Sequence, residues 1–256
     1  MTSSLRVAWG IAARSLMLIP RVPSTFVPSI VMPAFLTVAM AGAFSGLVLL
    51  PGFPAAKALD WFIPMTTVQG AAFAGITTGM GVARDLESGF YDRLLLSPTS
   101  RSALLAGPLV ASVLRAVIPL VLLVLIAVVS GATFAGGAAA TLATLSIASF
   151  GMALVAGAWS LGLALRFKTQ QAAPLMQSGV FLVVFLSTAQ MPIDYLTGWL
   201  HAVARVNPMT NVLGLAREGF LGAVTWDGTW PGLVSLAGLS IATIAFAGRA
   251  MTKVVP

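Results

Sequence analysis

Cysteine is absent from the 256-residue sequence, histidine occurs once, and charged residues make up only 8% of the chain. Without cysteine, disulfides and thiolate chemistry are excluded, and the redox compartment leaves no trace in the sequence. The single histidine, His201, has no cysteine or second histidine to complete a metal site, so we expect no metal and interpret it as a tolerated polar residue. Neither Lys168 nor Lys253 follows the glycine spacing of a phosphate-binding loop, so we expect no nucleotide hydrolysis by this chain.

Hydrophobic residues dominate instead, at 58% of the sequence, with a mean hydropathy of +0.98. This composition is typical of integral membrane proteins and excludes a soluble domain. The length leaves room for about six spans of ~20 residues, but not for a nucleotide-binding domain of ordinary size. The net charge of +7 would suggest nucleic acid as the partner of a soluble protein, but basic residues at the ends of membrane loops instead set orientation. We therefore predict an all-α integral membrane protein with one transmembrane domain, residues 1–256, and no nucleic-acid partner.

Residues 3–21 are predicted to form an amphipathic helix on the cytoplasmic surface of the membrane. At 100° per residue, its basic residues and its large apolar residues fall on opposite sides. The basic sector holds Arg6, Gly10, Arg14 and Arg21, and the apolar side holds Leu5, Trp9, Ala12 and Leu16. A cleaved signal peptide ending near Ala39 and Ala41 is the alternative, but the apolar run continues well past the ~7 to 15 residues of such peptides.

Six long apolar segments are predicted to span the membrane. They cover about 24–50, 59–83, 103–129, 138–165, 172–189 and 231–247. With both termini in the cytoplasm, one side of this topology carries Arg6, Arg14, Arg21, Arg84, Arg93, Arg101, Arg166, Lys168, Arg249 and Lys253, and the other carries Lys57, Arg205 and Arg217. Because basic residues favour the cytoplasmic side, we predict this orientation.

Pairs of glycines four residues apart occur in the first span, Gly42 and Gly46, and in the second, Gly75 and Gly79. Small residues at this spacing let helix backbones approach closely. We interpret both pairs as packing sites within the chain, with an interface between subunits as the alternative.

Arg115 is a charge inside the third predicted span, ~20 Å from Arg101 along a helix. Either this helix begins in the cytoplasm before entering lipid, or the arginine faces a polar interior. The first alternative is favoured because residues 118–129 alone are short for a span.

Residues 84–101, RDLESGFYDRLLLSPTSR, form the densest run of charge in the chain. Leu86, Phe90 and Leu94 recur at four-residue spacing, which predicts a short helix that ends before Pro98. We expect residues 85–98 to form an exposed loop that binds a partner. A solvated loop whose arginines only fix the topology is the alternative.

Residues 190–222 are too polar and too interrupted to cross the membrane. We predict a re-entrant pair of helices that enters from the outside, the first starting after Asp194 and the second near Thr210, separated by Asn207 and Pro208. Trp226 and Trp230 are expected to anchor the following span at the interface.

The order of these parts resembles the permease subunits of ATP-binding-cassette exporters of the daunorubicin-resistance and polysaccharide-export type. Two motifs carry the resemblance, which covers essentially the whole chain. The first is RDLESGFYDRLLLSPTSRSALLAGPLVASVLR, and the second is MPIDYLTGWLHAVARVNPMTNVLGLAREGFLG. One departure is Phe90-Tyr91, where many relatives have a small residue and a threonine.

The resemblance implies that the charged loop is a coupling helix, which docks on a separate ATPase subunit. Phe90, Tyr91 and Leu94 could then supply the buried anchor, with Asp92 and Arg93 as the polar rim. The full expected coupling set is Arg84, Asp85, Glu87, Gly89, Phe90, Tyr91, Asp92, Arg93, Leu94, Pro98 and Arg101, with Arg6 and Arg14 sharing in the contact. In the second motif, the residues that match the family's pattern belong to the predicted re-entrant helix pair that enters the membrane from the outside. They are Pro192, Asn207, Pro208, Thr210, Arg217 and Gly222. ATP and Mg would bind to two partner ATPase subunits, so no cofactor is expected in this chain.

The resemblance further implies a multi-pass protein of the bacterial cytoplasmic membrane that works with a second copy of itself or a sister permease, with spans two and five lining the export path. Candidate path residues are Met65, Gln69, Phe73, Phe181 and Phe185, although ordinary packing requires the same residue types. Such an apolar lining suits a hydrophobic drug or lipid.

Two other functions remain open. An autonomous secondary carrier would require ionisable groups within the spans and would normally show inverted repeats, and neither is evident. A membrane-embedded enzyme or assembly factor would require an acid–base pair, which is also not evident, so we expect no catalytic residues.

Overall fold

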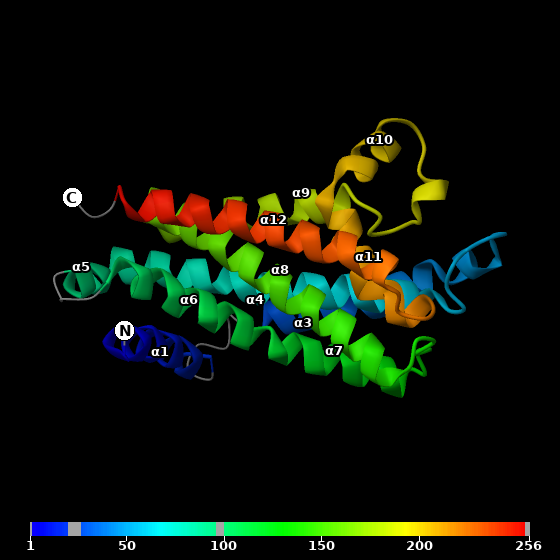
Figure 1. The fold of residues 1–256 in the computed structure, drawn as a ribbon, viewed down its shortest axis with the longest axis horizontal. Helices are drawn as coiled ribbons and strands as arrows, with labels where there is room; N and C mark the ends of the chain where they lie inside the picture. The colour runs from blue at the N-terminus through cyan, green and yellow to red at the C-terminus, as the bar shows by residue number, and fades with distance from the viewer. Residues whose placement is uncertain (1, 20–26, 96–99, 254–256) are drawn as a thin grey trace.

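The structure is a computed structural model that describes residues 2–19, 27–95 and 100–253. Within these ranges it is all-helical, which confirms the all-α part of the predicted fold class (Figure 1). The α-helices are α1 (Thr2–Met17), α3 (Pro28–Ala43), α4 (Ala58–Glu87), α5 (Phe90–Leu95), α6 (Arg101–Arg115), α7 (Val117–Val129), α8 (Ala138–Phe167), α9 (Ala173–Phe185), α10 (Gly198–Val206), α11 (Pro208–Leu221) and α12 (Trp226–Met251). Short 3-10 turns are η1 (Ser45–Leu49), η2 (Gln170–Ala172) and η3 (Ile193–Tyr195).

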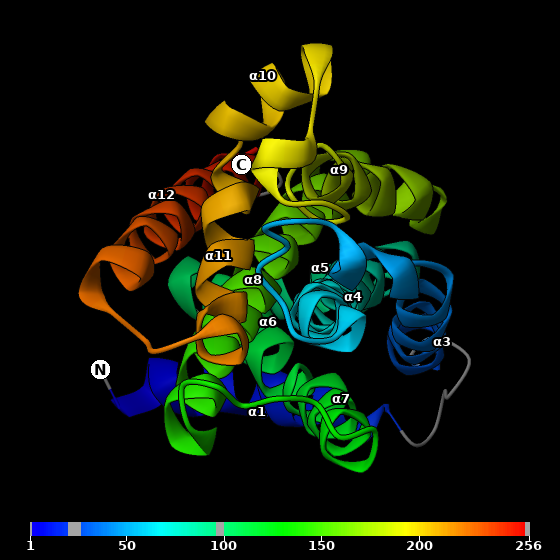
Figure 2. The same ribbon diagram turned by 90° about the vertical axis from the view of Figure 1, so that its right-hand side faces the viewer.

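Helices α4 and α8 form the centre of the bundle, and the other long helices surround them (Figure 2). Their backbones approach closely because glycines line the contact. A Cβ added to Gly75 would lie 2.5 Å from the carbonyl oxygen of Ala153, and one added to Gly79 would lie 2.5 Å from the backbone of Ser160. This confirms that Gly75 and Gly79 are packing positions within the chain. Gly42 and Gly46 face open space, so the packing prediction for that pair is wrong.

Three helical segments in the described part of the chain are long and apolar enough to cross a membrane: Arg101–Val129, which joins α6 and α7, then α8 and α12. Several boundaries differ from the predicted spans. Helix α4 continues to Glu87, α9 ends at Phe185, and α12 begins at Trp226. The first residues of the predicted charged loop, Arg84 to Glu87, therefore form the last turn of α4.

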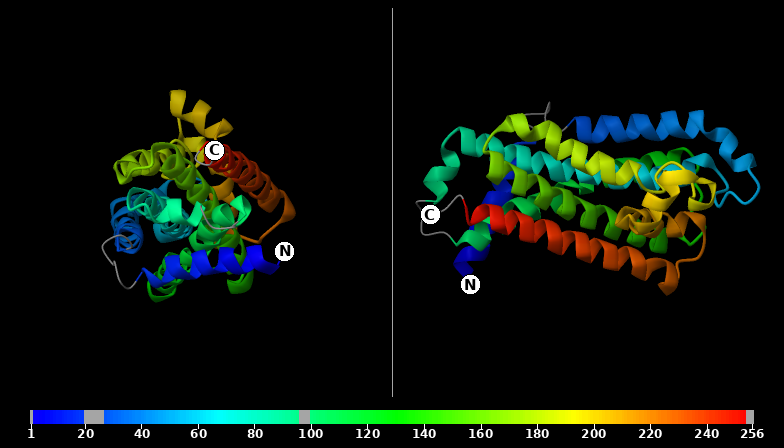
Figure 3. Two further views of the ribbon diagram at one scale, coloured as in Figure 1. Left: turned by 90° about the vertical axis from the view of Figure 1, so that its left-hand side faces the viewer. Right: turned by 90° about the horizontal axis from the view of Figure 1, so that it is seen from above.

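Helix α1, helix α5 and the end of α12 lie at the same end of the bundle, and we call this the basic end (Figures 1 and 3). Helices α10 and α11 and the connection from α7 to α8 lie toward the other end. Helix α1 runs across the long helices, as a helix on a membrane surface would. Both described ends of the chain are therefore at one end of the bundle.

Helix α1 has three faces rather than the two that the sequence predicts. Ala8 and Ala12 are buried against α6, where a Cβ on Gly107 would lie 2.9 Å from the carbonyl oxygen of Ala8. Leu5 and Trp9 point away from the protein and are 70% and 59% exposed. Ala12 therefore does not share the outward apolar face, because the small alanines are needed for close packing on α6. Arg21 lies outside the described residues.

Candidate functional site

The salt bridge between Arg14 and Asp85 ties α1 to the end of α4. The guanidinium donates to both carboxylate oxygens, with Nη1 2.6 Å from Oδ2 and Nη2 2.9 Å from Oδ1. The same guanidinium lies 4.1 Å from the ring centre of Phe90, the first residue of α5. The hydrogen bonds and the charge of Asp85 raise the pKa of Arg14. One arginine of α1 therefore engages two residues of the predicted coupling segment.

Glu87 ties the same segment to the connection between α8 and α9. Its carboxylate accepts hydrogen bonds from the Thr169 hydroxyl at 2.8 Å and from the Gln170 backbone N–H at 2.8 Å, and also from the Gln170 side-chain amide. These hydrogen bonds lower the pKa of Glu87. Asp85 and Glu87 are thus both engaged within the chain.

Helix α5 is attached to the bundle by its apolar residues. Gly89 adopts a φ of +69°, which permits the sharp turn from α4 into α5. Tyr91 is only 3% exposed and Leu94 packs against the main core, whereas Phe90 and Arg93 are exposed. Burial raises the pKa of the Tyr91 hydroxyl. Tyr91 therefore faces its own chain, which differs from the expectation that it offers an anchor to a partner.

The remaining residues of the predicted coupling set are distributed around this helix. Arg84 and Arg101 are exposed, and Arg101 begins α6 directly after its cap residue, Ser100. The side chain of Asp92 and all of Pro98 lie outside the described part of the structure. Arg6 is exposed on α1. The described candidates thus lie together at the basic end. Their arginines are exposed, and the carboxylates of Asp85 and Glu87 are hydrogen-bonded within the chain.

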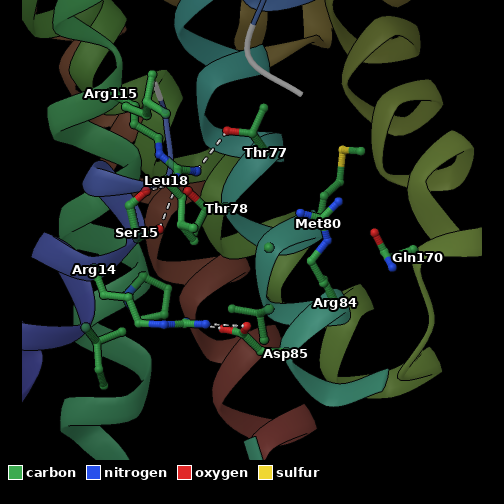
Figure 4. A pocket seen from close by; sticks show the side chains of 15 residues that line it. Arg14, Ser15, Leu18, Thr77, Thr78, Met80, Arg84, Asp85, Arg115 and Gln170 are labelled. Atoms are coloured by element: carbon green, nitrogen blue, oxygen red, sulfur yellow. Dashed lines mark hydrogen bonds and ion pairs between the residues drawn. The ribbon is translucent and has the colours of Figure 1, made fainter. Parts of the chain in front are cut away.

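Arg115 faces a polar interior, which is the second of the two alternatives raised by the sequence. It is 6% exposed, and Figure 4 shows its guanidinium between α1 and α4. It donates to Thr77 Oγ1 at 3.0 Å and to Ser15 Oγ at 2.9 Å, and also to the Ser15 carbonyl. Helix α1 supplies this partner because it folds against α6. A cavity of about 160 Å³ lies beside these residues.

Arg217 is buried in the bundle and is not an exposed charge on the outer side. It is 2% exposed, and its guanidinium lies 3.6 Å from the Trp61 ring centre. It donates to the carbonyl oxygens of Trp61, Thr188 and Ala189 at 3.1, 2.8 and 2.7 Å. Arg217 therefore joins α11 to α4 and to the segment after α9, so counting it as a loop charge was wrong.

Asn207 shapes the bend between α10 and α11. Its Oδ1 accepts from the Met209 N–H at 2.9 Å, and its Nδ2 donates to the carbonyls of Val183 and Leu186 at 2.8 and 2.9 Å. The Thr210 hydroxyl donates back across the bend to the Ala204 carbonyl at 2.7 Å. Helix α11 consequently begins at Pro208 with Asn207 as its cap, earlier than the predicted start near Thr210.

The two helices at this bend differ in burial. Helix α10 begins at Gly198, later than predicted, and Trp199 on it is 70% exposed. Helix α11 packs against α8, α12 and α4. Of the other motif residues, Pro192 is buried and Gly222 follows the end of α11. The predicted pair is therefore one buried helix and one peripheral helix.

Three of the five candidate path residues lie together. The ring centres of Phe73 and Phe181 are 5.3 Å apart, and those of Phe181 and Phe185 are 5.7 Å apart, which forms a partly buried aromatic row between α4 and α9. Met65 and Gln69 are 0% and 1% exposed inside the bundle. Both are therefore enclosed by the protein, whereas the three rings of the aromatic row are partly exposed.

Asp60 is a buried acid that sequence reasoning missed. It is fully buried at the start of α4, and its Oδ1 accepts from the Thr133 N–H at 2.8 Å. The sequence feature that could have identified Asp60 is its position in the first turn of a predicted helix, where a carboxylate is stabilised by the helix dipole.

Comparison with known proteins finds one matching family and two relatives of low identity. Residues 7–221 match the family model described as "ABC-2 type transporter". The daunorubicin resistance ABC transporter permease protein DrrB1 of Streptomyces coeruleorubidus is 27% identical over 171 residues, covering 66% of this chain and 60% of that protein. The probable multidrug ABC transporter permease YbhR of Escherichia coli K12 is 26% identical over 200 residues, covering 74% of this chain and 52% of that protein. The matches thus span between half and two thirds of each relative.

Proposed function

Because the chain belongs to the ABC-2 type transporter family, we propose that it is the membrane-spanning permease subunit of an ATP-driven exporter. Its two relatives are named as permeases for daunorubicin resistance and multidrug transport. In this proposal two partner ATPase subunits bind ATP and Mg, and this chain supplies the path through the bacterial cytoplasmic membrane with a second permease copy or a sister permease.

The family match carries the proposal, and helix α5 supports its coupling step. Helix α5 is short and exposed on one side, and it is held to the bundle by the buried Tyr91 ring, by Leu94 and by the contact of Phe90 with Arg14. The end of α4, from which α5 follows, is itself held by the hydrogen bonds of Asp85 and Glu87. A helix that packs firmly against the bundle would move together with it when a docked ATPase changes conformation. A flexible loop could change its own conformation instead and leave the bundle unmoved. We place the ATPase contact on the outward side of α5, at Phe90 and Arg93, with Arg84 and Arg101 at its rim.

The topology in this proposal has six spans with both termini in the cytoplasm. It is supported by the basic end, where α1, α5 and the end of α12 lie together and carry Arg6, Arg14, Arg93 and Arg249. Helix α11 then forms the re-entrant element, since its charge Arg217 is covered by protein on all sides. In this topology, helix α10 lies at the outer surface of the cytoplasmic membrane.

The proposed substrate is a hydrophobic drug-like or lipid-like molecule. The aromatic row of Phe73, Phe181 and Phe185 supports this choice, because it offers apolar contact to a passing molecule at the surface between α4 and α9. One relative is named for resistance to daunorubicin and the other as a probable multidrug permease, which supports a drug-like substrate.

The test is ATP-dependent transport of daunorubicin into inside-out vesicles that contain this chain together with a candidate partner ABC ATPase. Accumulation should require both proteins and hydrolysable ATP. Substitution of the catalytic residue of the ATPase should abolish it. Accumulation driven by a proton gradient without the ATPase would contradict the proposal and favour a secondary carrier.

A further inference from the structure

The cavity beside Arg115 is lined by polar and charged side chains from three helices. Helix α1 contributes Arg14 and Ser15, α4 contributes Thr77, Thr78, Arg84 and Asp85, and α6 contributes Arg115. Its volume of about 160 Å³ is several times the ~30 Å³ that one water occupies in the liquid. The space is therefore large enough for a phosphate-sized group.

The charges that line this cavity are unbalanced. Asp85 is the one acid among its lining residues, and Arg14 already binds both of its carboxylate oxygens. Arg84 and Arg115 then leave the cavity with two net positive charges. Glu87, one turn further along α4, does not line the cavity and is bound to Thr169 and Gln170.

Arg115 also has donor capacity that the described residues do not use. Its Nη1 and Nη2 groups bind only neutral oxygens of Thr77 and Ser15, and its buried Nε–H has no partner in the described part of the chain. The buried hydroxyl of Thr78 is likewise without a partner there. A buried cation that meets only neutral groups is costly, and an anion beside it would offset the desolvation of the guanidinium.

We propose that this cavity binds the phosphate group of an anionic phospholipid. Arginine matches phosphate well, because its planar fork can donate two parallel hydrogen bonds to phosphate oxygens, and the threonine hydroxyl can donate a further one. A membrane source is favoured because α1, which closes the cavity, presents the exposed apolar side chains of Leu5 and Trp9. Basic pockets between helices near a membrane surface are suited to such headgroups.

The experiment is native mass spectrometry of the full-length chain released from nanodiscs that contain equal amounts of phosphatidylglycerol and phosphatidylcholine. Wild type should retain phosphatidylglycerol preferentially. Arg84→Gln and Thr78→Val should each reduce this preference several-fold, and Arg115→Gln should reduce it about tenfold or more. Arg249→Gln, which removes an exposed arginine at the end of α12 outside the cavity, is the matched control and should behave as wild type.

A second arm uses phosphatidylcholine nanodiscs with inorganic phosphate and measures the thermal unfolding midpoint. Stabilisation by phosphate with no preference for phosphatidylglycerol in the first arm would overturn the lipid assignment and identify a soluble anion. Equal retention of phosphatidylglycerol by wild type, Arg84→Gln and Thr78→Val would overturn the site altogether. If Arg115→Gln does not fold, the other two variants decide the question, because Arg84 is exposed and Thr78→Val keeps the side-chain shape.

Discussion

The guanidinium of Arg14 and the carboxylate of Asp85 form a two-hydrogen-bond salt bridge between residues 71 positions apart in the chain. The bridge connects the surface helix α1 to the last turn of α4, directly before α5. The end of α4 that leads into α5 is therefore held directly by α1. This relationship makes α1 a structural part of the proposed coupling region.

Loss of this salt bridge should loosen α1 from the bundle. Because the sequence has no cysteine, a single Ile11→Cys substitution gives a reporter on the face of α1 that packs against Gly107 of α6, and cysteine is smaller than the residue it replaces. Adding Arg14→Ala or Asp85→Ala should speed thiol labelling of this cysteine, and the exchange of both charges, Arg14→Asp with Asp85→Arg, should partly restore protection. The coupling energy from the double-mutant cycle should be about 1 kcal/mol, since the pair is partly exposed. Labelling rates unchanged by Arg14→Ala would show that the bridge does not hold α1.

Glu87 should give the basic end an acid-sensitive contribution to stability. Its folded-state pKa is lowered from the ordinary value of 4.5, so the unfolded chain binds its proton first as the pH falls. The contribution is fully present above pH 4.5 and is lost as the pH falls through the lowered pKa. Thermal unfolding of wild type and Glu87→Gln should therefore differ at pH 6 and converge at lower pH. A constant difference across that range would contradict the role of the ionised carboxylate.

A methyl group at Gly79 should force α4 and α8 apart. The added Cβ would lie 2.5 Å from the backbone of Ser160. Because the clash is with backbone, a change of side-chain rotamer cannot remove it. Gly79→Ala should lower the free energy of unfolding by about 1–3 kcal/mol. Gly81→Ala is the matched control, because a Cβ there meets no atom within 4 Å and alanine favours the helix. Equal unfolding midpoints for the two variants would mean that the helices do not approach this closely.

Replacement of Arg217 should destabilise the bundle near α11. Arg217→Met removes hydrogen bonds to three carbonyl oxygens and the contact with the Trp61 ring. We expect a loss of at least about 2–3 kcal/mol in unfolding free energy, because hydrogen bonds to a charged group are strong and the carbonyls are left without their partner. Arg205→Met on α10 removes an exposed arginine and should be nearly neutral. The comparison is made by thermal unfolding in one detergent.

The sequence allowed prediction of the features that depend on composition and local spacing. Long apolar helices and the close packing at Gly75 and Gly79 follow from such patterns. The spacing of Leu86, Phe90 and Leu94 predicted one short helix, but the turn at Gly89 divides it, so that Leu86 belongs to α4 and the other two residues to α5. Side-chain directions did not follow. Tyr91 lies at helical spacing on α5, but only the position of α5 against the bundle determines that this ring faces inward.

The partners of the charged residues were also beyond prediction from one sequence. From the sequence, Arg217 is interpreted as a loop charge. Only the position of α11 against α4 shows that carbonyls from two separate segments surround it. Arg115 likewise finds Ser15 only after α1 folds back across α6. These contacts join residues about 30 to 160 positions apart, so no local pattern encodes them.

The most direct test of the central claim is co-purification of the chain with its candidate partner ABC ATPase, using matched charge reversals at the basic end. Arg93 and Arg249 are both exposed there, but Arg93 lies on α5 and Arg249 on α12. We expect Arg93→Glu to reduce retention of the ATPase by about tenfold while Arg249→Glu retains it as wild type does, with both variants inserting normally. Equal retention by both variants, or no retention by the wild type, would contradict the assignment of α5 as the helix on which an ATPase docks.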